Sequence, residues 1–179
     1  MFTEETFKTE RIYEGKVLNL RVDTVELPDK KYSKREIVEH PEAVGILPIT
    51  KEGKIILVEQ FRKPVEKSLL EIPAGKVESK EKPIVCALRE LEEETGYTSS
   101  EIKKINQFYT TPGFSNEIMH IFLATNLKKG NAKPDDDEYI KKYEFTIGEI
   151  LEKIKKGELE DSKTLVAILQ YREIINNTL

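Results

Sequence analysis

Residues 75–97 read GKVESKEKPIVCALRELEEETGY, a glycine loop followed by an acidic helix. Glu90, Glu93 and Glu94 lie within about one and a half turns and nearly on one side of that helix, so their charges repel one another. Arg89 stands beside them. A bound divalent cation would relieve the repulsion and would supply a catalyst for phosphate chemistry. The stretch therefore predicts a metal site on a helix.

The acidic helix is expected to begin near Pro83, because proline suits the first helical position. Gly96 is expected to end it. A rotation of about 100° per residue predicts that one stripe faces the core, made of Ile84, Leu88, Leu91 and Thr95. The three glutamates fall outside that stripe.

Upstream of the glycine loop, the pattern of apolar residues is typical of β-strands. Residues 43–49 and 54–60 are apolar strands, and the short Glu52-Gly53 connection favours a hairpin between them. A short strand at residues 68–73 runs into the loop. A small N-terminal sheet is expected from three further strands, at residues 7–13, 17–27 and 34–39. This sheet has few large apolar residues, so it must pack on the main body or on a second subunit.

Downstream, strands are expected at residues 102–109 and 118–127, around a turn at Pro112-Gly113. Residues 128–137 are polar and predict a loop. Helices are expected to begin at Thr146, where Glu149 completes a capping box, and at Asp161. Mixed strands with a few helices indicate the α+β class.

Composition limits the possible roles of the 179-residue chain. The length predicts one domain, or one with a small appendage. A net charge of −4 argues against nucleic acid as the main partner. The single cysteine, Cys86, excludes an internal disulfide. The sequence contains neither a signal-like run nor a stretch near the roughly 18 apolar residues of a membrane helix. We therefore expect a cytoplasmic protein that does not bind membranes.

The spacing from Gly75 through Glu81, Arg89-Glu90-Leu91 and Glu93-Glu94 to Gly96-Tyr97 resembles the Nudix box without a departure. The resemblance implies an α/β/α sandwich around a mixed sheet. It also implies hydrolysis of a nucleoside diphosphate linked to another group. On this basis residues 1–40 are expected to be an N-terminal β-sheet extension, for dimerisation or substrate binding, and residues 41–179 the Nudix hydrolase domain.

The flanks of the box narrow the resemblance. Residues 35–41, 59–62 and 71–75, together with Pro112 in Thr-Pro-Gly-Phe-Ser, resemble the ADP-ribose pyrophosphatases. The resemblance implies cleavage of ADP-ribose to AMP and ribose 5-phosphate. Pyrophosphatases that act on other nucleotide sugars share several of these flanks, so a broader nucleotide-sugar or dinucleotide pyrophosphatase is the alternative. A non-catalytic ADP-ribose sensor is a further alternative, although such sensors typically lack box glutamates.

Glu90 and Glu94 are the best pair of metal ligands, because a spacing of one turn directs both at one ion. Glu93 is expected as a third ligand, and the resemblance adds the backbone carbonyl of Ala74. Oxygen ligands suit magnesium, with manganese as the alternative. Glu92 is interpreted as part of a solvated face.

Two further residues are expected to serve the reaction. The planar fork of Arg89 can orient a glutamate and offset the acidic cluster. The resemblance places a general base on a loop after the sheet, and Glu138 in Asp135-Asp136-Asp137-Glu138 is our choice. An exposed acidic turn is the alternative interpretation of that loop.

Substrate contacts are expected from both flanks of the box. Arg35 and Arg62 could bind phosphates or the terminal ribose, and ordinary surface arginines are the alternative. The remaining candidates are Glu71 for a ribose hydroxyl, then Pro112, Ser115 and Glu117 for the far end of the pocket. The resembling enzymes exchange their N-terminal sheets, so we expect a homodimer. His40 and His120 are interpreted as turn or core histidines.

Overall fold

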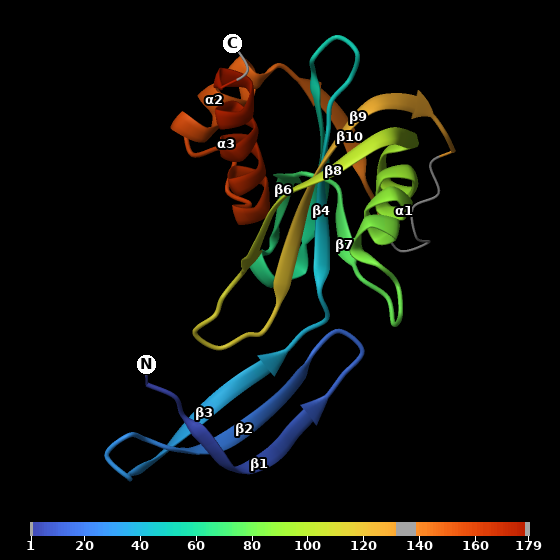
Figure 1. The fold of residues 1–179 in the computed structure, drawn as a ribbon. Coiled ribbons are helices and arrows are strands. Elements are labelled where there is room, and N and C mark those ends of the chain that lie inside the picture. The colour runs from blue at the N-terminus through green and yellow to red at the C-terminus, as the bar shows by residue number, and fades with distance from the viewer. Residues whose placement is uncertain (1, 132–138, 178–179) are drawn as a thin grey trace. The chain divides into compact units, whose positions relative to one another are not determined.

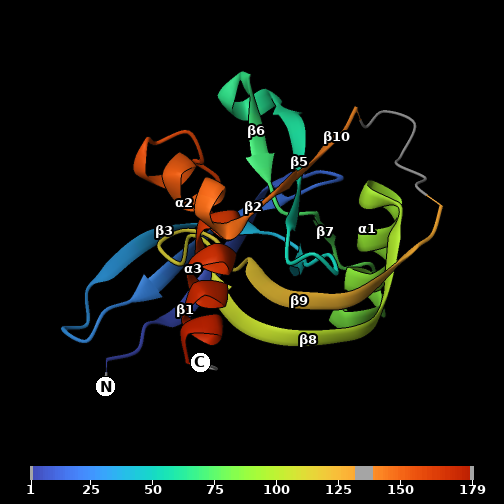
Figure 2. The ribbon, with the colours of Figure 1, turned by 90° about the horizontal axis from the view of Figure 1, so that it is seen from above.

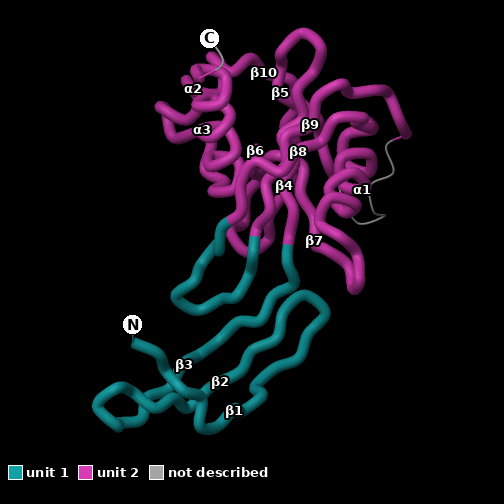
Figure 3. The backbone as a smooth tube through the Cα atoms, viewed as in Figure 1, with its two compact units in different colours: residues 1–42, 108–118 teal, residues 43–107, 119–179 magenta. Residues whose placement is uncertain are grey.

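The computed structural model describes residues 2–131 and 139–177. The backbone divides into two compact units (Figure 3). The first comprises Met1–Glu42 and Phe108–Ile118, and the second Ala43–Gln107 and Met119–Leu179. The first unit therefore joins the N-terminal segment to a loop that comes about 70 residues later in the chain.

The first unit is a three-stranded antiparallel sheet in the order β1-β2-β3. Its strands are β1 (Glu5–Glu14), β2 (Asn19–Glu26) and β3 (Tyr32–Glu39). The three expected strands are thus confirmed. The loop at 108–118 attaches to the end of β3, where Val38 N donates to Phe114 O at 2.8 Å and Asn116 N donates to Val38 O at 3.3 Å.

The second unit contains two sheets (Figures 1 and 2). One has the order β7-β4-β9-β8 and the other β10-β5-β6. The strands are β4 (Ala43–Pro48), β5 (Ile55–Arg62), β6 (Lys67–Glu71), β7 (Ala74–Lys76), β8 (Tyr97–Tyr109), β9 (Ile118–Lys129) and β10 (Lys141–Phe145). β4 pairs parallel with β9 and antiparallel with β7, so the sheet is mixed as expected.

Helices flank these strands on two sides (Figure 1). α1 (Pro83–Thr95) packs on β4 and β7, whereas α3 (Ser162–Asn176) contacts β4 and α2 (Ile147–Lys155) contacts α3 and β10. The arrangement confirms the expected α/β/α sandwich of the α+β class. No helix in residues 2–131 and 139–177 is both long and apolar enough to cross a bilayer.

Two strand expectations need correction. The segments at 43–49 and 54–60 share only one bridge, between Ile49 and Ile55, and then enter different sheets. They do not form a hairpin, because β7 and β9 already occupy both edges of β4. β10 was not predicted. Its five residues are too few to show a clear alternation, and it exists by pairing with β5.

The caps of the helices agree with the sequence. Gly96 ends α1 in a left-handed conformation with φ 70°, and its N–H donates to Glu92 O at 2.8 Å. Thr146 and Glu149 form the expected capping box of α2. Asp161 caps α3 by accepting from Thr164 N.

The buried face of α1 is rotated from the expected stripe. Of the four expected positions, Leu91 and Thr95 are buried, whereas Ile84 is exposed and Leu88 half-buried. Cys86 and Ala87 join Leu91 in a core cluster with residues of β4, β5 and β9, and Glu94 is also buried. The rotation brings one carboxylate of the box into the interior, where it requires polar partners.

Candidate active site

Gly75 lies against the carboxylate of Glu90. A Cβ atom at Gly75 would stand 1.9 Å from Glu90 Oε1 and 2.0 Å from its Cδ, far inside van der Waals contact. Gly75 belongs to β7, where it pairs with Val44. Close approach of a side chain, and not a turn, therefore explains this glycine.

Arg89 donates hydrogen bonds to three carboxylates. Its Nη1 donates to Glu90 Oε1 at 2.7 Å and to Glu93 Oε2 at 2.9 Å. Its Nε and Nη2 donate to the two oxygens of Glu81 at 3.1 and 3.2 Å. The bonds to Glu81, followed by the charge of Glu90, raise the pKa of Arg89. The guanidinium thus offsets the acidic cluster and fixes where its side chains lie.

Glu94 is held against the strand that precedes the helix. It is 8% exposed, and its Oε2 accepts from Ala74 N at 3.2 Å. The bond links the last turn of α1 to Ala74, whose carbonyl is expected as a ligand. Glu90, Glu94, Gly75 and Ala74 consequently form one continuous region where β7 meets α1.

The donor chemistry of this region fits a hard divalent cation, because carboxylate oxygens are the ligands that magnesium and manganese prefer. Gly75 also leaves the space that places Glu90 beside Ala74. Among the residues described, no three acidic, histidine or cysteine side chains already stand together as a ligand set. The oxygens of these glutamates already accept hydrogen bonds from Arg89 and from Ala74 N. A cation would therefore bind by competing with those contacts.

Arg62 and Glu71 contact each other. Nε of Arg62 donates to Glu71 Oε1 at 2.7 Å and Nη2 to Oε2 at 2.8 Å. Glu71 is 2% exposed and also accepts from Lys163. A carboxylate so buried and so fully engaged is a poor partner for a ribose hydroxyl. The structure therefore favours a supporting role for Glu71 and leaves Arg62, which is 38% exposed, as the candidate contact.

Arg62 also lies within the electrostatic range of the box. The bonds to Glu71 are the main cause that raises its pKa, and the charge of Glu94 adds to them.

The other substrate candidates belong to the first unit. Arg35 is held by Glu4 through Nε at 2.9 Å and Nη2 at 2.5 Å. Glu117 accepts from Thr110 Oγ1 at 2.6 Å, and its N–H donates to Ser115 Oγ at 3.2 Å. Pro112 lies in the turn that Thr111 O closes by accepting from Ser115 N at 2.9 Å. Their roles stay predictions, as does that of Glu138, which lies outside the described residues.

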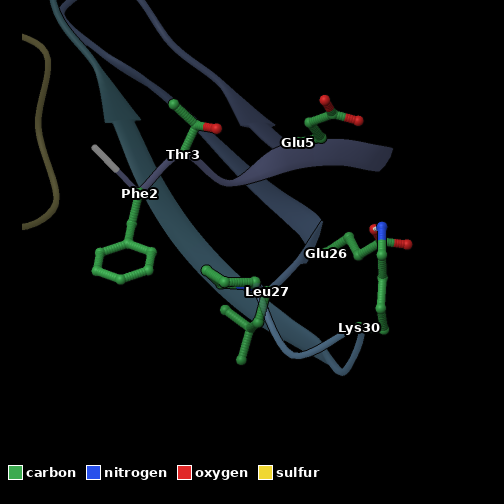
Figure 4. Close-up of a pocket in the computed structure, with 7 residues that line it drawn as sticks. Phe2, Thr3, Glu5, Glu26, Leu27 and Lys30 are labelled. Carbon is green, nitrogen blue, oxygen red and sulfur yellow. Dashed lines mark hydrogen bonds and ion pairs between the residues drawn. The ribbon is translucent and has the colours of Figure 1, made fainter.

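The first unit contains a hollow of about 250 Å³ at the β2–β3 turn (Figure 4). Phe2 and Leu27 form its apolar part, while Glu26 and Lys30 pair at its rim at 2.5 Å. It contains none of the expected substrate residues. We therefore assign the site chemistry to the box and not to this hollow.

The sequence did not predict the contacts of several polar residues. Lys163 of α3 contacts Glu71 and also pairs with Asp161, the N-cap of that helix, and only the cap at Asp161 had a local signal. Glu92 is not simply solvated, because it is half-buried and accepts from Asn131 N at 3.3 Å. The interpretation as a core histidine is confirmed for His120, which is buried in β9. His40 lies in the extended connection after β3, where its Nδ1 is 2.8 Å from Pro41 O and 3.3 Å from Glu117 Oε1.

Comparisons with known proteins agree with the fold and with the position of the box. Residues 39–167 match the NUDIX domain, and residues 4–38 match the nucleoside diphosphate sugar hydrolase N-terminal domain. A solved structure described as an ADP compounds hydrolase superposes with a TM-score of 0.88 at 18% identity. That superposition covers 98% of this chain and 95% of the other and concerns the fold.

Three curated relatives cover most of the chain. An ADP-ribose pyrophosphatase of Bacillus subtilis is 51% identical over 96% of this chain and 95% of its own length. A methanol dehydrogenase activator of Bacillus methanolicus is also 51% identical, over 99% and 98% of the two chains. A GDP-mannose pyrophosphatase of Cronobacter sakazakii is 32% identical over 80% and 81%.

Proposed function

Because this chain belongs to the Nudix family and is a Nudix hydrolase, we propose that it cleaves the pyrophosphate bond of ADP-ribose to AMP and ribose 5-phosphate. The observation that carries the proposal is the contact of Glu90 with Gly75, because it places a box carboxylate beside Ala74, next to the buried Glu94. The similarity to the Bacillus subtilis relative supports the choice of ADP-ribose.

Nudix hydrolases generally use divalent metal ions, and we assign magnesium to this one, with manganese as the alternative. The ligands would be the carboxylates of Glu90, Glu93 and Glu94 and the carbonyl of Ala74. A divalent ion held there supplies a coordinated water of lowered pKa and neutralises charge on the pyrophosphate. Arg89 keeps the carboxylates oriented, and Glu81 fixes Arg89 in turn.

The remaining roles follow from charge and position. The guanidinium of Arg62 would bind a phosphate of the substrate, since a fork of donors matches phosphate oxygens. Glu138 would accept the proton of the attacking water. Arg35, Pro112, Ser115 and Glu117 would contact the substrate from the N-terminal unit, which we propose as the extension that serves substrate binding and dimerisation.

A homodimer through the N-terminal sheet is part of the proposal. β1 is an edge strand of ten residues, every one of them exposed. The exposed side chains of this sheet include Phe7 at 74%, Tyr13 at 58% and Tyr32 at 57%. A long edge with exposed aromatic residues is a template for pairing with another chain. Sedimentation at micromolar concentration should give a dimer, and a monomer would refute this part.

A panel of substrates tests the central proposal. The protein would be incubated with magnesium and ADP-ribose, UDP-glucose, GDP-mannose, NADH, diadenosine polyphosphates or 8-oxo-dGTP, and phosphate release would be measured after coupling to a phosphatase. A preference for ADP-ribose is expected. Comparable turnover of several substrates would favour the broader pyrophosphatase, to which the GDP-mannose relative points. Binding of ADP-ribose without turnover would favour the sensor.

The Bacillus methanolicus relative supports a second candidate function, activation of an alcohol dehydrogenase. The test would add this chain to a methanol dehydrogenase and measure the rate of methanol oxidation. A Glu93→Gln variant separates two mechanisms. If it still activates, activation depends on contact between the proteins; if it does not, activation depends on hydrolysis. No effect of the parent chain would remove this candidate.

A further inference from the structure

Two cations from separate parts of the second unit hold the carboxylate of Glu71, at the end of β6. Arg62, at the end of β5, donates to both oxygens, and Lys163, in the first turn of α3, donates through Nζ to Oε2. Glu71 is 2% exposed and the side chain of Lys163 12%. The charges are therefore largely removed from water, and such contacts are directional and strong.

Lys163 is itself anchored. Its Nζ donates to Asp161 Oδ1 at 3.0 Å, and Asp161 Oδ2 caps α3 by accepting from Thr164 N at 3.0 Å. Thr164 Oγ1 accepts from Ile72 N at 2.7 Å. The first turn of α3 is thereby locked to the residues that follow β6. A side chain anchored at its charged end loses little further freedom when it holds Glu71.

Arg62 keeps one edge available. Its Nε and Nη2 are engaged by Glu71, whereas Nη1 makes no hydrogen bond within the part of the chain that the structure describes. The side chain is 38% exposed. A guanidinium fixed in its plane by one carboxylate can present its other edge to an anion in a defined direction.

We infer that Lys163 is a positioning residue for the hydrolytic reaction: it fixes Glu71, and Glu71 fixes the plane in which Arg62 meets the substrate's phosphates. The inference rests on the proposed function, because it takes Arg62 as a phosphate contact. Two effects follow from the geometry. Lys163 stops the carboxylate of Glu71 from rotating. It also neutralises part of the negative charge of Glu71, which Arg62 would otherwise neutralise alone.

A double-mutant cycle tests this inference. Steady-state kinetics with ADP-ribose and magnesium would be measured for Lys163→Met, Arg62→Met and the double variant. Lys163→Met is expected to raise KM about tenfold with a smaller effect on kcat, because a misplaced binding group costs binding first. The double variant is expected to have the KM of Arg62→Met, since Lys163 acts only through that residue. Lys163→Arg should bring KM back close to that of the parent.

A matched control is available in the same two segments. Lys67 of β6 pairs with Glu160, next to Asp161, but both side chains are about half exposed, at 48% and 50%. Lys67→Met removes a lysine–glutamate pair between the same segments and should leave KM unchanged. If Lys163→Met does not fold, Asp161→Asn keeps an acceptor at the helix cap, weakens the hold on Lys163, and should raise KM in the same direction.

The outcomes separate the inference from the function on which it rests. An unchanged KM in Lys163→Met would assign Lys163 to folding alone. Fold-changes in KM that multiply in the double variant would show that Lys163 acts independently of Arg62, and either result would overturn the inference. An unchanged KM in Arg62→Met would overturn the assignment of Arg62 and this inference together. Calorimetric binding of ADP-ribose gives the same comparison if turnover is absent, so failure of the hydrolytic function leaves the cycle measurable.

Discussion

The carboxylate of Glu90 occupies the space next to Gly75 where any other residue would carry its Cβ, at 1.9 Å from the position of that atom. The same carboxylate accepts from Arg89 Nη1 at 2.7 Å. The glycine and the arginine together determine where a box glutamate lies. Two residues that carry no metal-binding atom in their side chains are therefore part of the candidate site.

A Gly75→Ala substitution should separate activity from stability. The atoms that the new Cβ would meet are the far end of a flexible side chain, so Glu90 can swing away and the fold should survive. Moving the carboxylate should lower kcat/KM by about a hundredfold. Steady-state kinetics and thermal unfolding would be measured together. Gly148→Ala in α2 is the control, because a Cβ there meets only Thr146 Oγ1, at 4.0 Å.

Neutralising the box glutamates should abolish the proposed hydrolysis. Glu93→Gln and Glu94→Gln each remove a proposed charged ligand, and we expect kcat to fall by at least about a hundredfold, the upper end of the cost of losing an outer-sphere partner. In Glu94→Gln the new amide keeps an oxygen that can accept from Ala74 N, so the fold should persist. Addition of a chelator should stop the parent enzyme.

Glu92→Gln is the matched control for these two variants. Glu92 lies in the same run but accepts from Asn131 N, and glutamine retains that acceptor. Its activity should stay close to that of the parent. Parent-like turnover in Glu93→Gln and Glu94→Gln, or activity that a chelator leaves intact, would contradict a metal site on α1.

The pairing of Glu71 should contribute stability that depends on pH. Burial alone raises the pKa of this carboxyl, but the bonds to Arg62 and Lys163 outweigh burial and bring the pKa below 4.5. A group whose pKa is lowered by folding stabilises the protein above its unfolded-state pKa, and this contribution is lost as the pH falls through the folded-state pKa. The stabilisation should therefore be complete at pH 7 and decline below about pH 4.5.

Comparison with Glu71→Gln measures this contribution. At pH 7 the variant should be less stable by about 3 kcal/mol, the low end for breaking a buried pair, because Arg62 is partly exposed. The difference should shrink as the pH falls below 4.5, since the parent then also carries an uncharged group. Chemical unfolding at several pH values would test this. Glu152→Gln, which breaks an exposed pair with Lys155, should show no such difference.

The sequence was most informative where structure depends on near neighbours. Pro83, Gly96, and the Thr146–Glu149 capping box define helix ends through contacts within a few residues, and each expectation about them was correct. The spacing of the Nudix box likewise placed Arg89 beside Glu90 and Glu93. Local geometry of a helix follows directly from residue spacing.

Contacts between distant residues had no comparable signal. Lys163 and Glu71 are 92 positions apart, and neither looks unusual in its own segment. The strands at 43–49 and 54–60 have the pattern of a hairpin, yet β4 takes its neighbours from β7 and β9. Glu94 is polar and was expected outside the apolar stripe, but a backbone N–H of Ala74 makes its burial acceptable. Contacts between elements far apart in the sequence decide such features, and they cannot be inferred from periodicity.

The proposed general base, Glu138, can be tested directly. The box glutamates are engaged with the expected cation and with Arg89, so they cannot serve freely as a base, and another residue must accept the proton. Glu138→Gln removes the base and keeps the size of the side chain, so kcat should fall by about 10²- to 10⁴-fold while KM stays close to that of the parent. Steady-state kinetics over a range of pH would measure this, and the acidic limb of the profile should flatten. Asp136→Asn, two positions earlier in the same acidic run, is the control and should keep parent turnover. Full turnover by Glu138→Gln with normal binding of ADP-ribose would remove this residue from the mechanism and direct the search to another acceptor.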